Sequence, residues 1–218
     1  MTPARRAKPW LRAVPDAPVP ATAQARPTLG DAEIIEAVVC GDGAVAGELY
    51  DRLVHSVDQT LYRVLGKRES DHEDLVQSAF EQIVKTLATR RFAGACSLRT
   101  WASSVATHVG LNALRSRRRE RGVFDRSEVD APASTAGRDD PERDVTLRRD
   151  IDRVRAELGQ MNATRAEALL LHDVLGHDLA EIAALTGVSI AAAQSRLVRG
   201  RHELMERLGK RRPKGGRA

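Results

Sequence analysis

Aromatic residues and cysteines are both scarce in this sequence. Phe, Trp and Tyr together make up 3% of its 218 residues, and cysteine occurs twice, at Cys40 and Cys96. Two cysteines without metal-ligand spacing argue against a disulfide framework and indicate free thiols. No run of residues approaches the length of a membrane span, and prolines interrupt the N-terminal segment where a signal peptide needs an apolar stretch. We therefore expect a cytoplasmic protein that does not insert into a membrane.

The groupings expected of an enzyme are also missing. No paired carboxylates, nucleophile motif or phosphate-binding loop stands out, and the six histidines are scattered without ligand spacing. Such groupings are what a catalytic site requires. We expect no catalysis, no metal ion and no cofactor.

Aliphatic residues and arginines are what the sequence does contain. Its apolar fraction is 42%, mostly alanine, leucine and valine, which predicts an all-α protein with two small helical domains. The net charge is +5, and arginines gather in two runs, from Arg115 to Arg121 and from Arg196 to Arg207. One run alone fits a solvated helix end equally well, but two runs favour a polyanionic partner.

Apolar periodicity begins only after residue 28. Residues 1–28 are rich in Pro, Ala and Arg and predict a disordered tail. A short helix is expected from Asp31 to about Val39, and a longer one over 44–65. The longer helix repeats an apolar residue every four positions, at Leu49, Leu53, Val57, Leu61 and Leu65. This stripe predicts the core of the first domain.

The third and fourth helices carry distinct polar faces. The third begins near Ser70, whose spacing from Glu73 predicts a capping box. Acidic and amide side chains line the face of that helix opposite its apolar stripe. The loop RFAGACS follows, with Gly94 permitting a tight or an open backbone path. The fourth helix starts near Leu98 and runs into the first arginine run, with Trp101 expected in the core.

A polar segment separates this part from a second helical domain. Residues 122–147 hold Pro, Gly, Ser and Asp without a sustained period, which predicts a flexible linker. Residues 148–210 resume the helical pattern, and residues 211–218 form a basic tail. The expected core of the second domain consists of Leu158, Met161, Ala166, Leu169, Leu170, Leu171 and Val174.

The second domain ends in the pattern of a helix-turn-helix. Asp178 precedes LAEIAAL, Gly187 suits a left-handed helix end, and Ser189 is placed to cap the next helix. In such a unit the second helix enters the major groove, where Gln pairs with adenine and Arg with guanine. The alanines at 191–193 would allow a close approach to DNA. A plain helical hairpin explains the apolar positions but not the polar and basic side of the second helix.

Taken in order, these parts resemble an RNA polymerase sigma factor of the extracytoplasmic-function (ECF) group of the sigma-70 family. Three stretches carry the resemblance. HEDLVQSAFEQI is similar to the core-polymerase-binding helix, FAGACSLRTWASSVATHVGLNALRSRRR to the segment that melts and reads the −10 element, and DLAEIAALTGVSIAAAQSRLVRGRHEL to the −35-reading helix-turn-helix. By this resemblance 29–121 is sigma region 2, 148–210 is sigma region 4, and the partners are core RNA polymerase, promoter DNA and an anti-sigma factor.

The resemblance also implies the residues of each site. The polymerase contact would use Asp74, Leu75 and Gln77. The −10 site would use Phe92, Gly94, Ser97, Ser104, His108, Asn112 and Arg115, with the loop from Phe92 to Ser97 receiving a flipped base. The −35 site would use Ala192, Gln194, Ser195, Arg196, Arg199 and Arg201.

An alternative function is a helix-turn-helix regulator with an N-terminal sensor domain. A sensor would need a ligand pocket, whereas the N-terminal half offers few aromatic residues and an arginine run. The sequence therefore favours the sigma factor.

Overall fold

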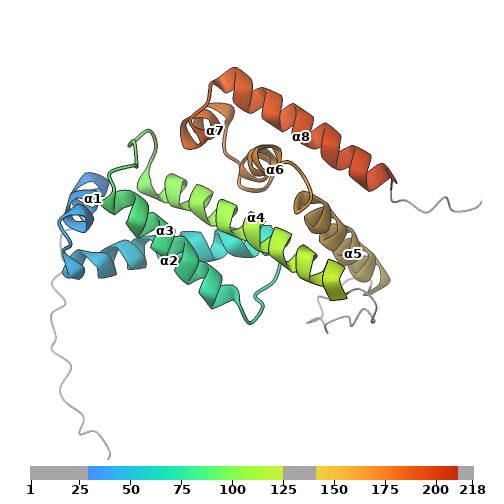
Figure 1. Cartoon of the computed structure of the whole chain (residues 1–218), viewed down its shortest axis with the longest axis horizontal. Coiled ribbons are helices and arrows are strands. Elements are labelled where there is room, and N and C mark those ends of the chain that lie inside the picture. The colour runs from blue at the N-terminus through green and yellow to red at the C-terminus, as the bar shows by residue number, and fades with distance from the viewer. Residues whose placement is uncertain (1–28, 125–140, 211–218) are drawn as a thin grey trace, which may run out of the picture.

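A computed structural model describes residues 29–124 and 141–210 of the chain (Figure 1). The expected disordered tail, the expected basic tail and the middle of the expected linker lie outside the described residues. Within them every regular element is a helix and no strand occurs, which confirms the all-α prediction. The helices form an N-terminal unit, α1 to α4, and a C-terminal unit, α5 to α8.

The N-terminal unit is built around one long apolar stripe. Its helices are α1 (Asp31–Val39), α2 (Gly43–Leu65), α3 (His72–Ala88) and α4 (Leu98–Phe124). The predicted stripe on α2 is confirmed, because all five of its members are buried in the first core cluster. Residues of α3 and α4 complete that cluster, among them Ile83, Leu87, Leu98 and Ala106. Trp101 is half-buried at its edge, which places it against the core as expected.

Polar contacts fix the ends of these helices. Asp31 at the start of α1 accepts hydrogen bonds from the Leu98 backbone N–H at 2.9 Å and from Arg52 at 3.2 Å. One carboxylate thus ties α1 to α2 and to the start of α4. The helix α4 is thereby held at its N-terminal end, next to the loop that precedes it.

The predicted capping box at the start of α3 is wrong. The N-cap is Asp71, and no side chain caps the helix there. Instead, Arg117 of α4 donates to Asp71 at 2.6 Å and pairs with Glu69 at 2.8 Å. The spacing of Ser70 and Glu73 predicted a local cap. Instead, the acidic side chains at this end pair with Arg117, which is distant in the sequence. Arg117 is therefore a structural member of the first arginine run.

A second polar cluster joins α2 to the turn before α3. Asp58 accepts from Arg68 Nη2 at 2.5 Å and from His72 at 2.7 Å. The hydrogen bond from Arg68 lowers the pKa of Asp58 below its ordinary value of 3.8, the His72 contact lowers it further, and burial opposes both. The ionised carboxylate is therefore the form that stabilises this corner.

Asp58→Asn is expected to lower the free energy of unfolding at pH 7, and this deficit should shrink as the pH falls below about 3.8. The folded-state pKa is depressed, so the stabilisation is present above the unfolded-state pKa and is lost as the pH falls through the folded-state value. Urea unfolding of both proteins between pH 7 and pH 3 measures the difference. Asp51→Asn, an exposed position on the same helix, is the control. A deficit that does not change with pH would contradict the assigned role.

The C-terminal unit begins earlier than expected. Its helices are α5 (Pro141–Leu158), α6 (Ala163–Leu169), a π-helical turn η1 (Leu170–Val174), α7 (Leu179–Thr186) and α8 (Ile190–Lys210). The helix α4 also continues to Phe124. The prediction of an irregular linker over 122–147 is therefore wrong at both ends. Pro141 suits the first turn of a helix, where its missing N–H costs nothing.

The predicted core of the C-terminal unit is confirmed with one exception. Six of its seven members are buried, whereas Val174 is 38% exposed. The cause is the turn η1, in which the Leu175 N–H bonds to the Leu170 carbonyl five residues back at 3.0 Å. This wider turn breaks the period of 3.6 residues on which the prediction rested.

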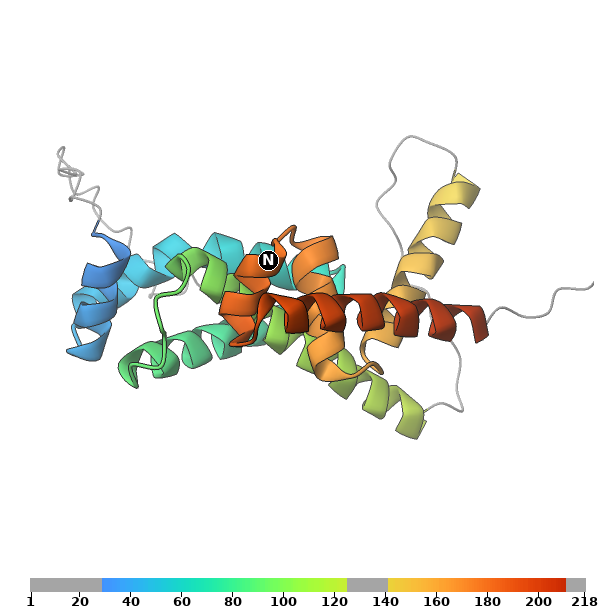
Figure 2. The same ribbon diagram turned by 90° about the horizontal axis from the view of Figure 1, so that it is seen from above.

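The two units pack against each other. Figure 2 shows α6, α7 and α8 lying over α4 and the other helices of the N-terminal unit. Val64 of α2 and Leu111 of α4 share an apolar cluster with Leu158, Met161 and Leu170 of the C-terminal unit. The domains expected to be joined only by a linker thus share a buried contact.

Candidate functional site

The turn between α7 and α8 is built from local hydrogen bonds. Asp178 accepts from the Glu181 N–H at 2.8 Å, and Glu181 accepts from the Asp178 N–H at 3.1 Å, which forms a capping box. Gly187 ends α7 with φ 66° and ψ 35°, and the Ala192 N–H donates to Ser189 Oγ at 3.2 Å. The sequence prediction of a left-handed glycine followed by a serine cap is confirmed.

Apolar packing sets the angle between the two helices. Ile182 and Ala183 of α7 meet Ala193 of α8, and Leu171 completes the cluster. Ala193 is fully buried, so its small side chain allows α8 to approach α7. The expectation that the alanines at 191–193 serve a close approach to DNA is wrong for Ala193.

The outer side of α8 presents a mixed polar and apolar face. Gln194 and Arg199 are exposed, whereas Ala192, Ser195 and Arg196 are half-buried. Val198, four residues after Gln194, is 58% exposed and was missed by the sequence prediction. Its spacing of four residues from Gln194 places both side chains on one face of α8, and this spacing could have predicted it. An apolar side chain here can contact the methyl group of thymine.

Arg201 already has a partner inside the protein. Its Nε donates to the Asp173 carboxylate at 3.0 Å, and its Nη2 contacts the same carboxylate. His172 Nδ1 lies 2.8 Å from Asp173 Oδ1. The hydrogen bond from Arg201 is the main reason that the pKa of Asp173 is lowered. Arg201, which the resemblance placed among the −35 residues, is thus partly neutralised within the protein.

The loop before α4 is anchored at both ends. Phe92 packs on Trp101 with ring centroids 4.9 Å apart, and Ser97 Oγ accepts from the Thr100 N–H at 3.1 Å. Gly94 between them is exposed and has φ 68°, a left-handed conformation that suits glycine. Phe92 and Ser97 therefore shape the loop, and the backbone around Gly94 is the part open to a ligand.

The predicted −10 residues on α4 are not all at the surface. His108 and Asn112 are exposed and lie one turn apart. Arg115 is half-buried and donates to Asn112 at 3.3 Å and to the Met161 carbonyl at 3.5 Å. Ser104 is buried and donates to the Trp101 carbonyl at 2.8 Å, so it does not reach the surface in this arrangement.

The predicted polymerase contact lies on the open side of α3. Asp74 and Gln77 are exposed, and Leu75 is half-buried against the first core cluster. Gln77 donates to Glu81 at 3.2 Å, one turn further along the helix. The three residues therefore lie on one short stretch of α3, two of them exposed and one turned toward the core.

In the parts of the chain that the structure describes, no group of three or more His, Cys, Asp or Glu residues is placed to hold a metal ion. Both cysteines are free thiols. Among the same described residues, no helix combines the length and apolar character that crossing a bilayer requires.

Helices arranged in two units, the second of which holds a capped helix-turn-helix, are the architecture of a DNA-binding protein. Comparison with known families gives a match to "Sigma-70 region 2" over residues 49–120 and to "Sigma-70, region 4" over residues 151–204. The chain belongs to the sigma-70 family of RNA polymerase sigma factors, in its ECF group.

Two relatives identified by sequence, CarQ and SigG, agree with this assignment, and one solved structure is similar at lower identity. The RNA polymerase sigma factor CarQ of Myxococcus xanthus is 32% identical over 137 residues, which are 63% of this chain and 74% of CarQ. The ECF RNA polymerase sigma factor SigG of Mycobacterium tuberculosis (strain H37Rv) is 34% identical over 66% of this chain and 43% of its own length. A solved structure of CnrH with the cytosolic domain of CnrY covers 84% of this chain and 99% of its own, at 22% identity and a TM-score of 0.48.

Family membership settles the general function. The protein is a sigma factor that binds core RNA polymerase, recognises promoter elements and directs transcription initiation, and it is not an enzyme. The alternative of a regulator with an N-terminal sensor domain is not favoured, because residues 49–120 match sigma region 2.

Proposed function

We propose that three surfaces of this chain divide the work of promoter recognition. The exposed residues Asp74 and Gln77 bind core polymerase, the Gly94 loop with His108 and Asn112 reads the −10 element, and the outer face of α8 reads the −35 element. The proposed domain ranges, 29–121 and 148–210, enclose the two family matches.

The exposed face of α8 is the observation that carries this proposal. The capped turn at Gly187 fixes α8 on α7, and Gln194, Val198 and Arg199 then point away from the core. Amide and guanidinium groups read bases through paired hydrogen bonds, and valine supplies apolar contact. A helix that served only packing would have no need to present these groups together.

Reconstituted transcription tests the proposal. Core polymerase that cannot initiate alone is mixed with the purified chain and a library of random duplexes, and the initiated transcripts are sequenced. We expect enrichment of one pair of upstream elements at fixed spacing. Initiation without any sequence preference, or no initiation, would reject the proposed division of surfaces.

The double substitution Asp74→Ala with Gln77→Ala is expected to weaken binding to core polymerase by about tenfold or more while the fold persists. Both side chains are exposed, and alanine is a good helix former. Titration of labelled chain with core polymerase gives the affinity, and thermal unfolding checks the fold. Lys85→Ala, exposed on the same helix, is the matched control. Equal affinity of the double variant and the parent would remove α3 from the polymerase contact.

The remaining partner assignment is also a proposal. An anti-sigma factor is expected to hold the free chain inactive, as the resemblance implies. Because the polymerase of bacteria works in the cytoplasm, the proposed function also places this chain there.

A further inference from the structure

Arg201 lies on the face of α8 that we propose to read the −35 element. It follows Gln194 by seven residues and Val198 by three, and a helix brings residues at these intervals to one side. All three side chains are exposed, as is Met205, one turn further along. A cation at this place on α8 is positioned to meet a phosphate of the DNA whose bases the helix contacts.

A carboxylate of the protein already fills the hydrogen-bonding fork of Arg201. Asp173 of η1 accepts from Arg201 Nε at 3.0 Å and contacts Nη2 of the same guanidinium. Arginine binds carboxylates and phosphates through the same pair of N–H groups, so one fork cannot serve both anions fully. The hydrogen bond from Arg201 also lowers the pKa of Asp173, which keeps the carboxylate ionised at neutral pH. The charge of Arg201 is therefore cancelled on the face where it would attract DNA.

This ion pair is not needed to hold α8 in place. Backbone packing does so one residue earlier, because a Cβ added to Gly200 would lie 2.9 Å from the Arg165 carbonyl oxygen of α6. Arg165 also pairs with Glu203 of α8 at 2.9 Å. The Arg201 and Asp173 side chains are 49% and 32% exposed, and ion pairs at such exposure add little to stability. The pair therefore changes the charge of the surface more than the stability of the fold.

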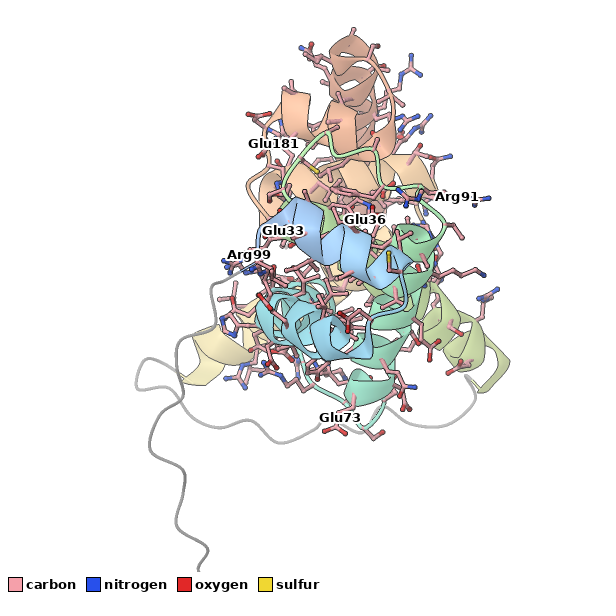
Figure 3. The ribbon with its side chains drawn as sticks, turned by 90° about the vertical axis from the view of Figure 1, so that its left-hand side faces the viewer. Glu33, Glu36, Glu73, Arg91, Arg99 and Glu181 are labelled. Carbon is pink, nitrogen blue, oxygen red and sulfur yellow. The ribbon has the colours of Figure 1, made fainter. Side chains whose placement is uncertain are left out.

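The neighbouring acidic residues of the helix-turn-helix have a different role. Asp178 and Glu181 form the capping box of α7, where Glu181 can be found in Figure 3. Each of these two carboxylates accepts a hydrogen bond from a backbone N–H of the turn. The Asp173 carboxylate instead accepts from a side chain of α8, and His172 Nδ1 lies 2.8 Å from its Oδ1. The fold of the turn therefore does not account for Asp173.

An anion beside a DNA-binding face acts mainly on binding without sequence preference. Contacts to phosphates supply such binding, and each phosphate neutralised steepens the dependence of log affinity on log salt by about 0.9. A bidentate contact to a base by Gln194 depends on the identity of the base pair and not on the charge of Arg201. Cancelling that charge therefore lowers the affinity for arbitrary DNA more than for the preferred element, and widens the ratio between the two affinities.

We propose that Asp173 is a specificity-determining residue, which keeps Arg201 from the phosphates of arbitrary DNA by binding its guanidinium. The ligand that competes with Asp173 is the DNA phosphate group. Binding to a phosphate then replaces one anion by another on the same fork, so it gains less than binding by an arginine without an internal partner. This inference deepens the proposed reading of the −35 element by α8 and rests on it.

The salt dependence of binding to random DNA tests this role. The full chain is titrated onto a short fluorescent duplex of random sequence, from about 50 to 300 mM salt. Asp173→Asn should bind this duplex about fivefold or more tightly than the parent at about 0.1 M salt, and its slope of log affinity against log salt should be steeper by about one. Asp173→Glu keeps a carboxylate for the guanidinium and should resemble the parent.

Two comparisons separate the ion pair from the change in net charge. In the Asp173→Asn background, Arg201→Ala should abolish the steeper slope, because no freed guanidinium remains. Asp150→Asn, at an exposed position on α5, changes the net charge by the same amount and should not steepen the slope by one. An equal gain in the Asp150→Asn and Asp173→Asn chains would leave only a general effect of charge and would overturn the proposal.

The selected −35 duplex supplies the measurement of specificity. Asp173→Asn should gain less affinity for this duplex than for the random one, so that the ratio of the two affinities falls. An equal gain on both duplexes would overturn the assigned role. So would an Asp173→Asn chain that binds the random duplex no more tightly than the parent, or that does not bind it at all.

Asp173→Ala is a second variant that frees Arg201, and thermal unfolding checks the fold of both. Loss of the fold in both variants would make the ion pair structural and would overturn the proposal. If the chain directs no initiation by core polymerase, the proposed function fails. The comparison of free chains on random DNA still decides whether Asp173 keeps Arg201 from phosphates, so the two failures are distinguishable.

Discussion

Ile182→Ala is expected to unfold the helix-turn-helix and to abolish −35 recognition. Ile182 is 1% exposed at the centre of the cluster formed by Leu171, Ala183 and Ala193. Truncation of a buried isoleucine to alanine costs about 2–5 kcal/mol, and this small cluster has few other large side chains to compensate. Chemical unfolding followed by circular dichroism gives the stability, and binding to the selected −35 duplex gives the function.

Ile190→Ala is the matched control, since Ile190 is exposed at the start of α8 and should change stability little. The N-terminal unit keeps its own core cluster in the Ile182 variant. Binding to core polymerase through α3 should therefore persist. A parallel loss of polymerase binding would show that the two units fold only together.

Gln194→Ala and Arg199→Ala are each expected to change which −35 sequence is preferred. Both side chains are exposed on the outer face of α8, where a bidentate contact to a base is worth about 1–3 kcal/mol, or roughly 5- to 150-fold in affinity. Selection of binding sites from a random library, repeated for each variant, measures the preference. Each variant should lose discrimination only at the base pair that the substituted residue contacts.

Arg201→Ala is the comparison for these two. Arg201 is bound to Asp173, so Arg201→Ala should weaken binding to every DNA sequence by a similar factor. This factor should be smaller than for a phosphate-binding arginine without an internal partner, and the affinity should depend slightly less steeply on salt. A changed preference in the Arg201 variant, with Gln194 and Arg199 silent, would show that α8 enters the groove in another orientation.

Periodic apolar residues predicted most of the fold. The stripe on α2 is confirmed because residues four apart lie on one face of a helix, and the turn at Gly187 is confirmed because its hydrogen bonds join residues close in sequence. The sequence could not show that Leu111 and Val64 are buried by the other unit. Such a contact joins residues that are far apart in the chain, and an aliphatic residue on a helix looks the same whether its own domain or another covers it.

The arginines illustrate the same limit for the candidate site. Arg117 and Arg201 lie within the two predicted runs, yet both are bound to carboxylates of the protein. A basic run in a sequence does not tell which of its members pair internally, because the partner can lie on any other helix. Arg199 and Arg201 are both exposed, so it is the ion pair with Asp173 that distinguishes Arg201 from Arg199.

The π-helical turn at 170–174 acts as a phase shift between the two halves of the C-terminal unit. One additional residue in a helix changes the direction of every later side chain by about 100°. In this turn Leu170 faces the contact with the N-terminal unit, and the adjacent Leu171 faces the helix-turn-helix. In a variant with one residue fewer here, the chain could not keep both Leu170 against the N-terminal unit and Leu171 against the helix-turn-helix. The orientation of the helix-turn-helix relative to the rest of the C-terminal unit therefore depends on one residue of chain length in this turn, whatever the side chain of that residue.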